Sequence, residues 1–232
     1  RKKGLYEKEQ TTAYLFLLPS FMSFMFLMSY PVIYGFLLSF TNNKGVNSKL
    51  NFVGLAGYKR LLTDSYFSTS LLNNLFYMAT FTPMVIAVAL SFAVILNRRI
   101  LGRQFFRTSF FFPYIVSMVS VAIVWNYLLA PNGPVNSVLM AFRISNPPQW
   151  LISKQWAMFA IVIVSVWKEF GFYMVILLAG LQTIPEYLYE ASIIDGANPW
   201  QKFIHITLPM LSPTLFLSIV MAIISSFQVF DL

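Results

Sequence analysis

The sequence predicts an all-α protein that crosses a membrane several times. Of its 232 residues, 58% are hydrophobic and only 10% are charged, whereas a soluble domain carries about 25% charged residues. The apolar residues fall into blocks separated by short polar clusters. A helix needs about 20 apolar residues to cross the hydrocarbon of a bilayer, so these blocks predict a polytopic bundle of membrane helices.

Five membrane spans can be marked on hydropathy alone. They cover residues 13–40, 71–96, 108–130, 156–184 and 210–230, so that residues 13–232 form one transmembrane domain behind a polar tail of residues 1–12. Several spans contain prolines, namely Pro19, Pro31, Pro83, Pro113 and Pro213. We expect kinks at these prolines, because neighbouring helices and hydroxyl side chains can satisfy the carbonyls that a proline frees.

The first apolar block is too long for the core of a cleavable signal peptide, so we interpret it as a retained helix. The last block is followed at once by Asp231 and Leu232. We therefore expect the printed chain to be a piece of a longer polypeptide, with a sixth helix beyond it.

Basic residues predict the orientation in the membrane, since cytoplasmic loops are enriched in lysine and arginine. They cluster before the first span and between the second and third spans: Arg1, Lys2, Lys3, Lys8, Arg98, Arg99, Arg103 and Arg107. Both segments are expected in the cytoplasm. The formal net charge of +8 is therefore a topology signal, and we expect no nucleic acid as a partner.

The opposite segments, residues 42–70 and 131–155, are rich in turn-forming residues and are predicted as loops with short helical pieces at most. Four aromatic residues lie near this outer boundary: Trp125, Tyr127, Trp150 and Trp156. They are typical of an aromatic belt at the headgroup level, and stacking on a sugar is the alternative.

A polar segment of different character, residues 185–209, separates the fourth and fifth spans. Pro185 suits the first turn of a short helix, and Asp195 with Gly196 is expected to end it, because glycine permits a positive φ. Asn198 is a favourable N-cap and Pro199 a favourable first residue for a second short helix that runs toward Ile206. Leu188, Ala191 and Ser192 lie three to four residues apart, which predicts one stripe of the first helix with small residues that let another surface approach closely. An amphipathic helix that rests on the headgroups is the alternative interpretation.

The spacing within this segment carries a resemblance. Glu190, Ala191 and Ser192 are followed after three residues by Gly196, and after nine more by Ile206-Thr207-Leu208-Pro209. This pattern resembles the Glu-Ala-Ala loop of the permease subunits of binding-protein-dependent ABC importers, which have the MetI-like fold. Ser192 replaces a second alanine and is also small. Three longer sequence segments resemble the carbohydrate-uptake subfamily of the maltose and glycerol-phosphate type. They are LAGLQTIPEYLYEASIIDGANPWQKFIHITLP, FVGLAGYKRLL and RTSFFFPYIVS.

The resemblance implies a multi-pass protein of the bacterial inner membrane, with its N-terminus in the cytoplasm, that imports a sugar or oligosaccharide. It also implies the partners: a homologous second permease, two copies of an ABC ATPase that bind ATP and Mg²⁺, and an extracytoplasmic solute-binding protein. In such a family the polar segment is the cytoplasmic coupling helix that docks in a cleft of the ATPase. The residues carried over to that role are Glu190, Ala191, Ser192, Asp195, Gly196, Ile206, Leu208 and Pro209.

Two charged residues, Lys168 and Glu169, lie in the middle of the fourth span, where each charge costs a few kcal/mol unless it faces protein, water or a partner. A structural ion pair with a neighbouring helix or a partner subunit is one interpretation, and sugar recognition is the other. The resemblance favours recognition, with substrate contacts expected at Trp167, Lys168, Glu169, Phe172, Ser226 and Gln228.

The sequence lacks the residues that a membrane-embedded enzyme would need for catalysis. The chain contains no cysteine, a single histidine and neither an HExxH zinc motif nor a GxxxxGK[ST] phosphate loop. We therefore expect no catalytic residue, no metal site and no cofactor in this chain. His205 is expected to cap or pack. A secondary transporter or a channel remains compatible with hydropathy alone, and the coupling pattern argues against both.

Overall fold

The computed structural model describes residues 2–42, 51–98 and 100–228. Arg1, Arg99 and the end of the fifth predicted span at 229–230 lie outside this part of the chain, as do Asp231 and Leu232. The chain divides into two compact units, Arg1–Leu71 and Leu72–Leu232, each described below by itself. The described residues contain no strand, apart from an isolated bridge between Thr41 and Phe52, so the all-α prediction is confirmed.

The first unit holds α1 (Lys2–Phe24), a π-helical turn η1 (Met25–Ser29), α2 (Tyr30–Leu38) and α3 (Ala56–Thr63). Residues 12–38 form one apolar helix long enough to cross a membrane. The hydroxyl groups of Ser39 and Tyr58 lie 2.6 Å apart and join the end of α2 to α3.

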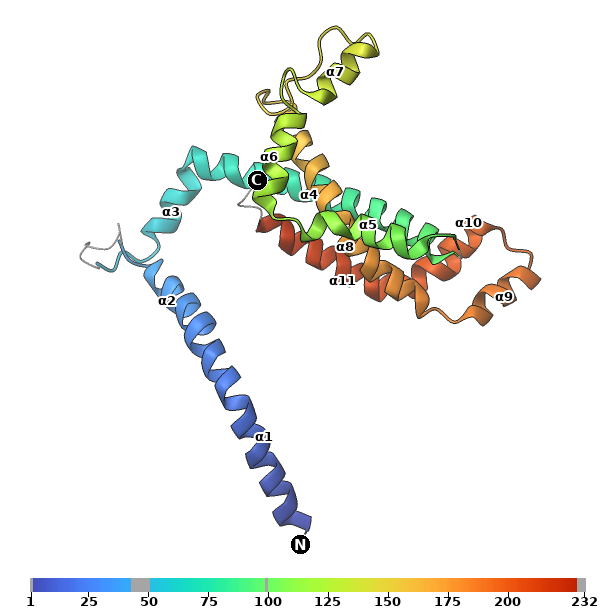
Figure 1. The fold of residues 1–232 in the computed structure, drawn as a ribbon. Helices are drawn as coiled ribbons and strands as arrows, with labels where there is room; N and C mark the ends of the chain where they lie inside the picture. The colour runs from blue at the N-terminus through green and yellow to red at the C-terminus, as the bar shows by residue number, and fades with distance from the viewer. Residues whose placement is uncertain (1, 43–50, 99, 229–232) are drawn as a thin grey trace. The chain divides into compact units, whose positions relative to one another are not determined.

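The second unit holds α4 (Ser65–Asn97), which begins in the first unit, and then α5 (Arg103–Ile115), α6 (Met118–Leu128) and α7 (Pro134–Ala141). It continues with α8 (Ala157–Gln182), α9 (Glu186–Ile194), α10 (Pro199–Lys202), η2 (Phe203–Thr207) and α11 (Leu208–Phe227). Figure 1 shows α8 beside α5 and α11. Buried side chains of α4, α8 and α11 form the core.

Close packing of α8 on α5 depends on a glycine. A Cβ atom added to Gly171 would overlap the carbonyl oxygen of Phe110 and lie 2.9 Å from the Cα of Phe111. The rings of Phe110 and Phe170 then pack beside this contact, with 5.8 Å between their centroids. Small residues at helix crossings of this kind are typical of membrane bundles.

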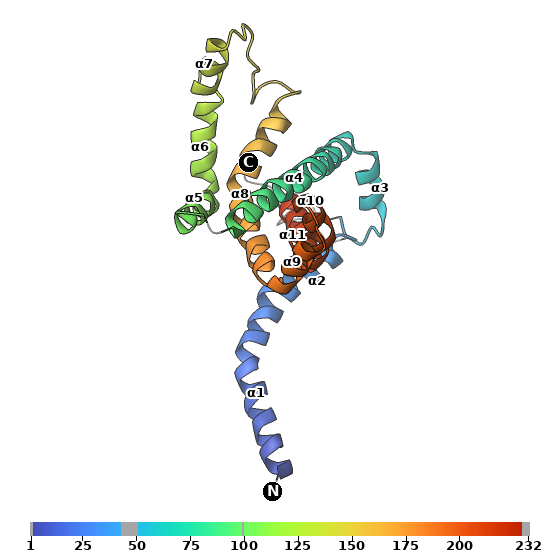
Figure 2. The ribbon, with the colours of Figure 1, turned by 90° about the vertical axis from the view of Figure 1, so that its right-hand side faces the viewer.

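The third predicted span differs from the structure. Hydropathy predicts one helix over 108–130, but α5 and α6 meet at an angle of 97°, and Figure 2 shows α6 leaving α5 steeply. Val116 and Ser117 are both extended, with ψ values of 138° and 137°, which ends α5 two residues after Pro113. The described part of the chain therefore has four continuous apolar helices long enough to span, or five if this bent pair counts as one.

Prolines lie inside the helices without ending them, as predicted, whereas the kinks expected at them stay a prediction. Pro19, Pro83 and Pro113 lie inside α1, α4 and α5, and Pro213 lies inside α11. Both π-helical turns, η1 and η2, directly precede a helix with proline at its start. A wider turn relieves the clash between a proline ring and the carbonyl four residues earlier.

The segment after α6 is organised around a buried asparagine. The Nδ2 of Asn136 donates to the carbonyl of Pro131 at 3.1 Å, and its Oδ1 accepts a bond from the Nε1 of Trp150 at 2.8 Å. Trp150 also packs edge-on against Trp156, and Trp125 packs on Trp167. These aromatic residues therefore have structural contacts within the chain.

Candidate functional site

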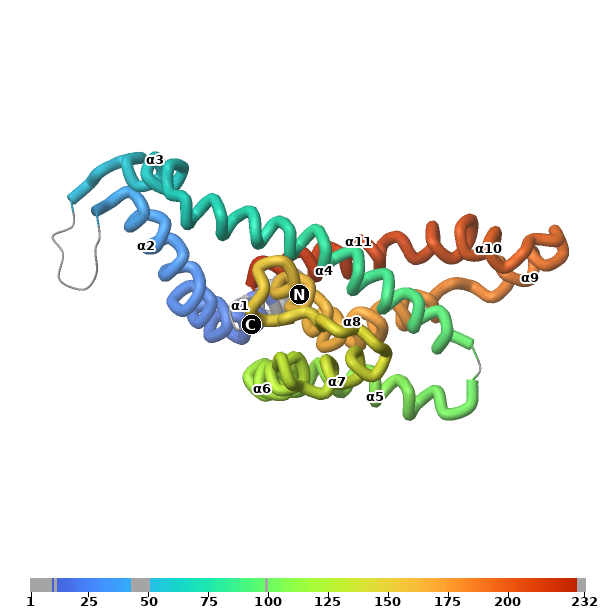
Figure 3. The backbone as a smooth tube through the Cα atoms, turned by 90° about the horizontal axis from the view of Figure 1, so that it is seen from above, coloured from blue at the N-terminus to red at the C-terminus, as the bar shows by residue number. Residues whose placement is uncertain are grey.

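The polar segment, residues 185–209, lies at one end of the second unit, where α8 ends and α11 begins (Figures 1 and 3). We call it the coupling segment, after the role that the resemblance implies. Pro185 is the N-cap of α9, and Glu186 occupies the first turn, where a carboxylate interacts favourably with the helix dipole. The predicted first helix is therefore confirmed.

The predicted bend is also confirmed, and it is a Schellman motif. Gly196 has a φ of +73°, and its N–H donates to the carbonyl of Ile193 at 3.1 Å while the N–H of Ala197 donates to that of Ser192 at 2.9 Å. These two bonds satisfy carbonyls at the end of α9. An added Cβ at Gly196 would meet no atom within 4 Å, so the glycine is required by the backbone conformation and not by crowding.

A capping box starts the second helix, as the Asn198-Pro199 pair predicts. The N–H of Gln201 donates to Oδ1 of Asn198 at 2.9 Å, and the N–H of Asn198 donates to Oε1 of Gln201 at 2.8 Å. This second helix is not separate, however. It continues from Pro199 through η2 into α11, and residues 199–227 form one membrane-length helix, because the π-helical turn accommodates Pro209.

Two faces of α9 differ in exposure. Leu188 and Tyr189 are half-buried against the core, and Ser192 is buried with its hydroxyl donating to the carbonyl of Tyr189 at 2.6 Å. The opposite stripe is exposed, and its side chains follow helical spacing: Tyr187, Glu190, Ala191 and Ile194. We call these four residues the outer stripe. Ile194 is 86% exposed.

This division corrects one expectation. The sequence suggests that Leu188, Ala191 and Ser192 share one stripe, with small residues that let another surface approach. Ala191 is exposed, but Ser192 is buried in this chain, so the two small residues do not share one open stripe. Of the other carried-over residues, Ile206 packs against the core, whereas Asp195, Leu208 and Pro209 are exposed.

A hollow of about 400 Å³ lies inside the bend. It brings together four of the residues expected in coupling, Ser192, Asp195, Gly196 and Ile206. His205 also lines it, and its Nδ1 lies 3.0 Å from the carbonyl oxygen of Gln201. The histidine therefore packs against its own helix, as expected.

A second candidate region lies inside the bundle, where α5, α8 and α11 meet. A pocket of about 420 Å³ is lined by Tyr114, Glu169, Phe172, Tyr173, Met221, Ile224, Ser225 and Gln228. The structure thus brings together three of the six predicted substrate residues: Glu169, Phe172 and Gln228. The hydroxyl of Ser225 donates to Oε2 of Glu169 at 3.2 Å.

Sequence reasoning missed Tyr114. Its ring stacks on that of Phe172 with 4.6 Å between centroids and 14° between planes, and the Nζ of Lys168 lies 5.6 Å from the centre of the Tyr114 ring. A cation at this distance from an aromatic face is attracted by its electrons. In the described residues no ion pair joins Lys168 to a carboxylate of a neighbouring helix, and its contact there is the Tyr114 ring of α5.

Two predicted residues lie elsewhere. Ser226 is buried and donates to the carbonyl of Ile223 at 2.6 Å, so its neighbour Ser225 takes the place in the pocket that Ser226 was expected to fill. Trp167 packs edge-on against Trp125 at 5.4 Å and does not line the pocket.

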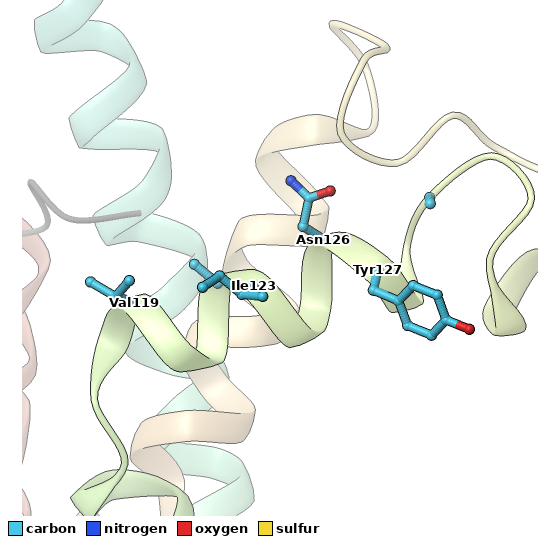
Figure 4. A pocket seen from close by; sticks show the side chains of 6 residues that line it. Val119, Ile123, Asn126 and Tyr127 are labelled. Carbon is cyan, nitrogen blue, oxygen red and sulfur yellow. The ribbon is translucent and has the colours of Figure 1, made fainter.

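A larger pocket, of about 590 Å³, lies along α6, away from both the coupling segment and the pocket between α5, α8 and α11. Its lining residues are Val119, Ala122, Ile123, Asn126, Tyr127 and Ala130. Figure 4 shows Val119, Ile123 and Tyr127 along this helix. The side chain of each is more than 60% exposed. An open face of one helix is a packing surface, not an enclosed binding site.

A bundle of membrane-length helices, with a capped polar segment between the last two of them, is an arrangement compatible with a membrane transport subunit. Residues 85–232 match the family described as "binding-protein-dependent transport system inner membrane component". The match covers more than half of the chain, which belongs to this family and is an integral membrane permease subunit of an ABC importer. Membership of this family favours an ATP-driven importer over a secondary transporter or a channel.

Named relatives extend over almost the whole chain. The arabinooligosaccharides transport system permease protein AraP of Bacillus subtilis (strain 168) is 32% identical over 232 residues, which cover 99% of this chain and 73% of AraP. The trehalose/maltose transport system permease protein MalF of Thermococcus litoralis is 34% identical over 226 residues, which cover 97% of this chain and 76% of MalF.

A solved structure has the same fold. A chain in the crystal structure of a bacterial alginate ABC transporter, in complex with an alginate pentasaccharide-bound periplasmic protein, is 26% identical. Its TM-score is 0.77, and the match covers 93% of this chain and 72% of that chain.

Proposed function

We propose that this chain imports a saccharide as one of two homologous permease subunits, together with two copies of an ABC ATPase and an extracytoplasmic binding protein. The named relatives support the substrate class, since AraP and MalF are described as transporting arabinooligosaccharides and trehalose or maltose. The alginate complex, which includes a periplasmic protein, supports the partner. The N-terminus and the coupling segment lie in the cytoplasm in this proposal.

The outer stripe of α9 is the observation that carries the proposal. Tyr187 and Ile194 are 65% and 86% exposed, and Glu190 and Ala191 lie between them on the same face. Exposed apolar side chains beside polar ones mark a protein interaction surface. In this proposal the ATPase covers the stripe, Ala191 packs in its cleft, and Glu190 meets a basic group.

The geometry suits the transmission of force. Leu188 and Tyr189 pack α9 against the core, and the hydroxyl groups of Tyr189 and Thr207 lie 3.0 Å apart, which ties α9 to η2. Since η2 runs directly into α11, a push on α9 is passed to a membrane helix. Closure of the ATPases turns the cavity outward, and ATP hydrolysis resets it.

ATP and Mg²⁺ belong to the partner in this mechanism. The sequence carries no GxxxxGK[ST] motif, whose backbone N–H groups and lysine would hold the phosphates. The role of this chain is therefore to position the saccharide and to respond to the ATPase.

The saccharide is held in the pocket between α5, α8 and α11. Glu169 and Gln228 offer hydrogen bonds to hydroxyl groups, and Ser225 orients the carboxylate of Glu169. The stacked rings of Tyr114 and Phe172 present an apolar surface suited to a pyranose. Such a combination of apolar walls and a few polar groups is typical of small-molecule sites.

Reconstitution of the whole assembly in proteoliposomes tests the proposal. Binding protein loaded with each of a panel of saccharides is added outside, and ATP hydrolysis and uptake are both measured. We expect at least one saccharide to stimulate both. An assembly that transports solutes without consuming ATP would contradict the proposal.

A further inference from the structure

A fourth cavity, of about 290 Å³, lies between the end of α4 and the coupling segment. Its lining residues are Val94, Asn97, Arg98, Leu181, Tyr189, Pro199, Lys202, Phe203 and Thr207. We call it the basic pocket. We propose that it binds a phosphate group, supplied by the headgroup of an anionic lipid.

The charge of the basic pocket is uncompensated. Arg98 and Lys202 both line it, and no aspartate or glutamate does. Within the described residues neither cation makes an ion pair, although Asp195 lines the neighbouring hollow together with Lys202. Two like charges beside one cavity repel each other, and an anion between them removes that cost.

The chemistry of the lining suits phosphate. Arginine offers a planar fork of N–H groups that matches phosphate oxygens, and lysine adds a point charge. The hydroxyl groups of Tyr189 and Thr207 are already bonded to each other at 3.0 Å, and Thr207 also donates to the carbonyl of Lys202 at 3.4 Å. The amide of Asn97 is the further neutral donor on the wall. A volume of about 290 Å³ holds roughly ten waters, which is room for a phosphate and part of a glycerol unit.

The position of the pocket favours a lipid as the source. Three apolar spans end or begin beside it: α4 ends at Asn97, α8 ends at Gln182, and the last span begins at Pro199. The pocket therefore lies at the boundary of the hydrocarbon, where headgroup phosphates are found. Basic pockets between membrane helices at the cytoplasmic side are suited to anionic headgroups.

The occupant connects two elements of the proposed mechanism. Arg98 follows α4, whereas Lys202 and Thr207 belong to the coupling segment. A phosphate held by both cations ties the end of α4 to the base of the segment. This effect on coupling rests on the proposed function, but the binding itself does not.

Native mass spectrometry of the purified importer in nanodiscs tests the binding directly. Phosphatidylglycerol and phosphatidylcholine are compared as retained lipids for the wild type and for Arg98→Gln, Lys202→Gln and Arg103→Gln. Arg103 is the matched control, because it lies after the same span but does not line the basic pocket. We expect retention of phosphatidylglycerol in preference to phosphatidylcholine, weakened roughly fivefold by either pocket variant and unchanged by Arg103→Gln.

An equal loss with Arg103→Gln, or equal retention of both lipids, would overturn the proposal. Inorganic phosphate added to importer in phosphatidylcholine nanodiscs, and followed by ³¹P NMR, separates the two sources. Phosphate binding that depends on Arg98 and Lys202, without retained phosphatidylglycerol, would keep the phosphate site but overturn the lipid as its source. Melting temperatures of all variants show whether each is folded, and none of these readouts requires saccharide transport.

Discussion

The ring of Tyr114 in α5 stacks on the ring of Phe172 in α8, with 4.6 Å between centroids and 14° between planes. The pair joins two helices at the wall of the pocket proposed for the saccharide. It also lies beside Lys168, whose Nζ is 5.6 Å from the centre of the Tyr114 ring. One aromatic residue thus holds both a stacking surface and a cation in place.

Replacing Tyr114 with leucine is expected to weaken saccharide binding to the purified importer roughly three- to tenfold, because an aromatic contact contributes about 0.5–1.5 kcal/mol beyond its buried area. Tyr114→Phe keeps the ring and should bind nearly as the wild type does. Titration of the saccharide without the binding protein, followed by calorimetry, measures this. Equal binding by the leucine variant would remove Tyr114 from the site.

Alanine at Lys168 or Glu169 is expected to reduce saccharide uptake more than tenfold, since hydrogen bonds to charged groups contribute about 1.5–3 kcal/mol. Assembly with the ATPase should be unchanged, because neither residue lies in the coupling segment. Ser225→Ala should give a smaller loss, as it removes only the donor that orients Glu169. Normal uptake by both charged-site variants would show that the pocket is assigned wrongly.

Gly196→Val is expected to uncouple ATP hydrolysis from uptake, because a φ of +73° costs a residue with a side chain about 1–2 kcal/mol and most for a β-branched one. Gly196→Asn should stay close to the wild type, since asparagine tolerates this conformation. The ratio of saccharide imported to ATP hydrolysed measures coupling. If the valine variant kept a normal ratio, the Schellman turn would have no mechanical role.

Gly171→Ala is expected to destabilise the bundle far more than Gly180→Ala. The added Cβ at Gly171 would meet the backbone of Phe110 and Phe111, which cannot move without shifting α5. At Gly180 the nearest atoms are the Oγ1 of Thr214 at 2.6 Å and the Cδ1 of Leu211 at 2.8 Å, which can rotate away. The Cβ of Thr214, at 2.9 Å, needs only a small shift of α11. Overpacking typically costs about 1–3 kcal/mol, and the thermal melting of the detergent-purified importer would rank the two variants.

Local signals in the sequence predicted the coupling segment well. Pro185, Gly196 and Asn198 each determine a backbone feature within a few residues of themselves, and the structure places a helix start, a left-handed turn and a capping box at these positions. The continuation through Pro209 was not predicted, because a π-helical turn has no comparable sequence signal.

Features that depend on tertiary structure were predicted less well. The break between α5 and α6 falls at Val116 and Ser117, in an apolar stretch without glycine, so hydropathy reads it as continuous. Ser225 and Ser226 differ by one position, which on a helix is a rotation of about 100°, and only packing decides which of them faces the pocket. Tyr114 could not be associated with Phe172 because the contact joins two helices far apart in the sequence.

The central claim is that the outer stripe of α9 docks on an ATP-hydrolysing subunit. Since the chain contains no cysteine, single cysteines at Ala191 and Ile194 can be compared with one at the inward-facing Leu188, each tested for crosslinking to the ATPase in the assembled importer. The account predicts crosslinks from Ala191 and Ile194, and none from Leu188. Labelling of Ala191 and Ile194 from the outer side of the membrane, without any crosslink to the ATPase, would contradict it.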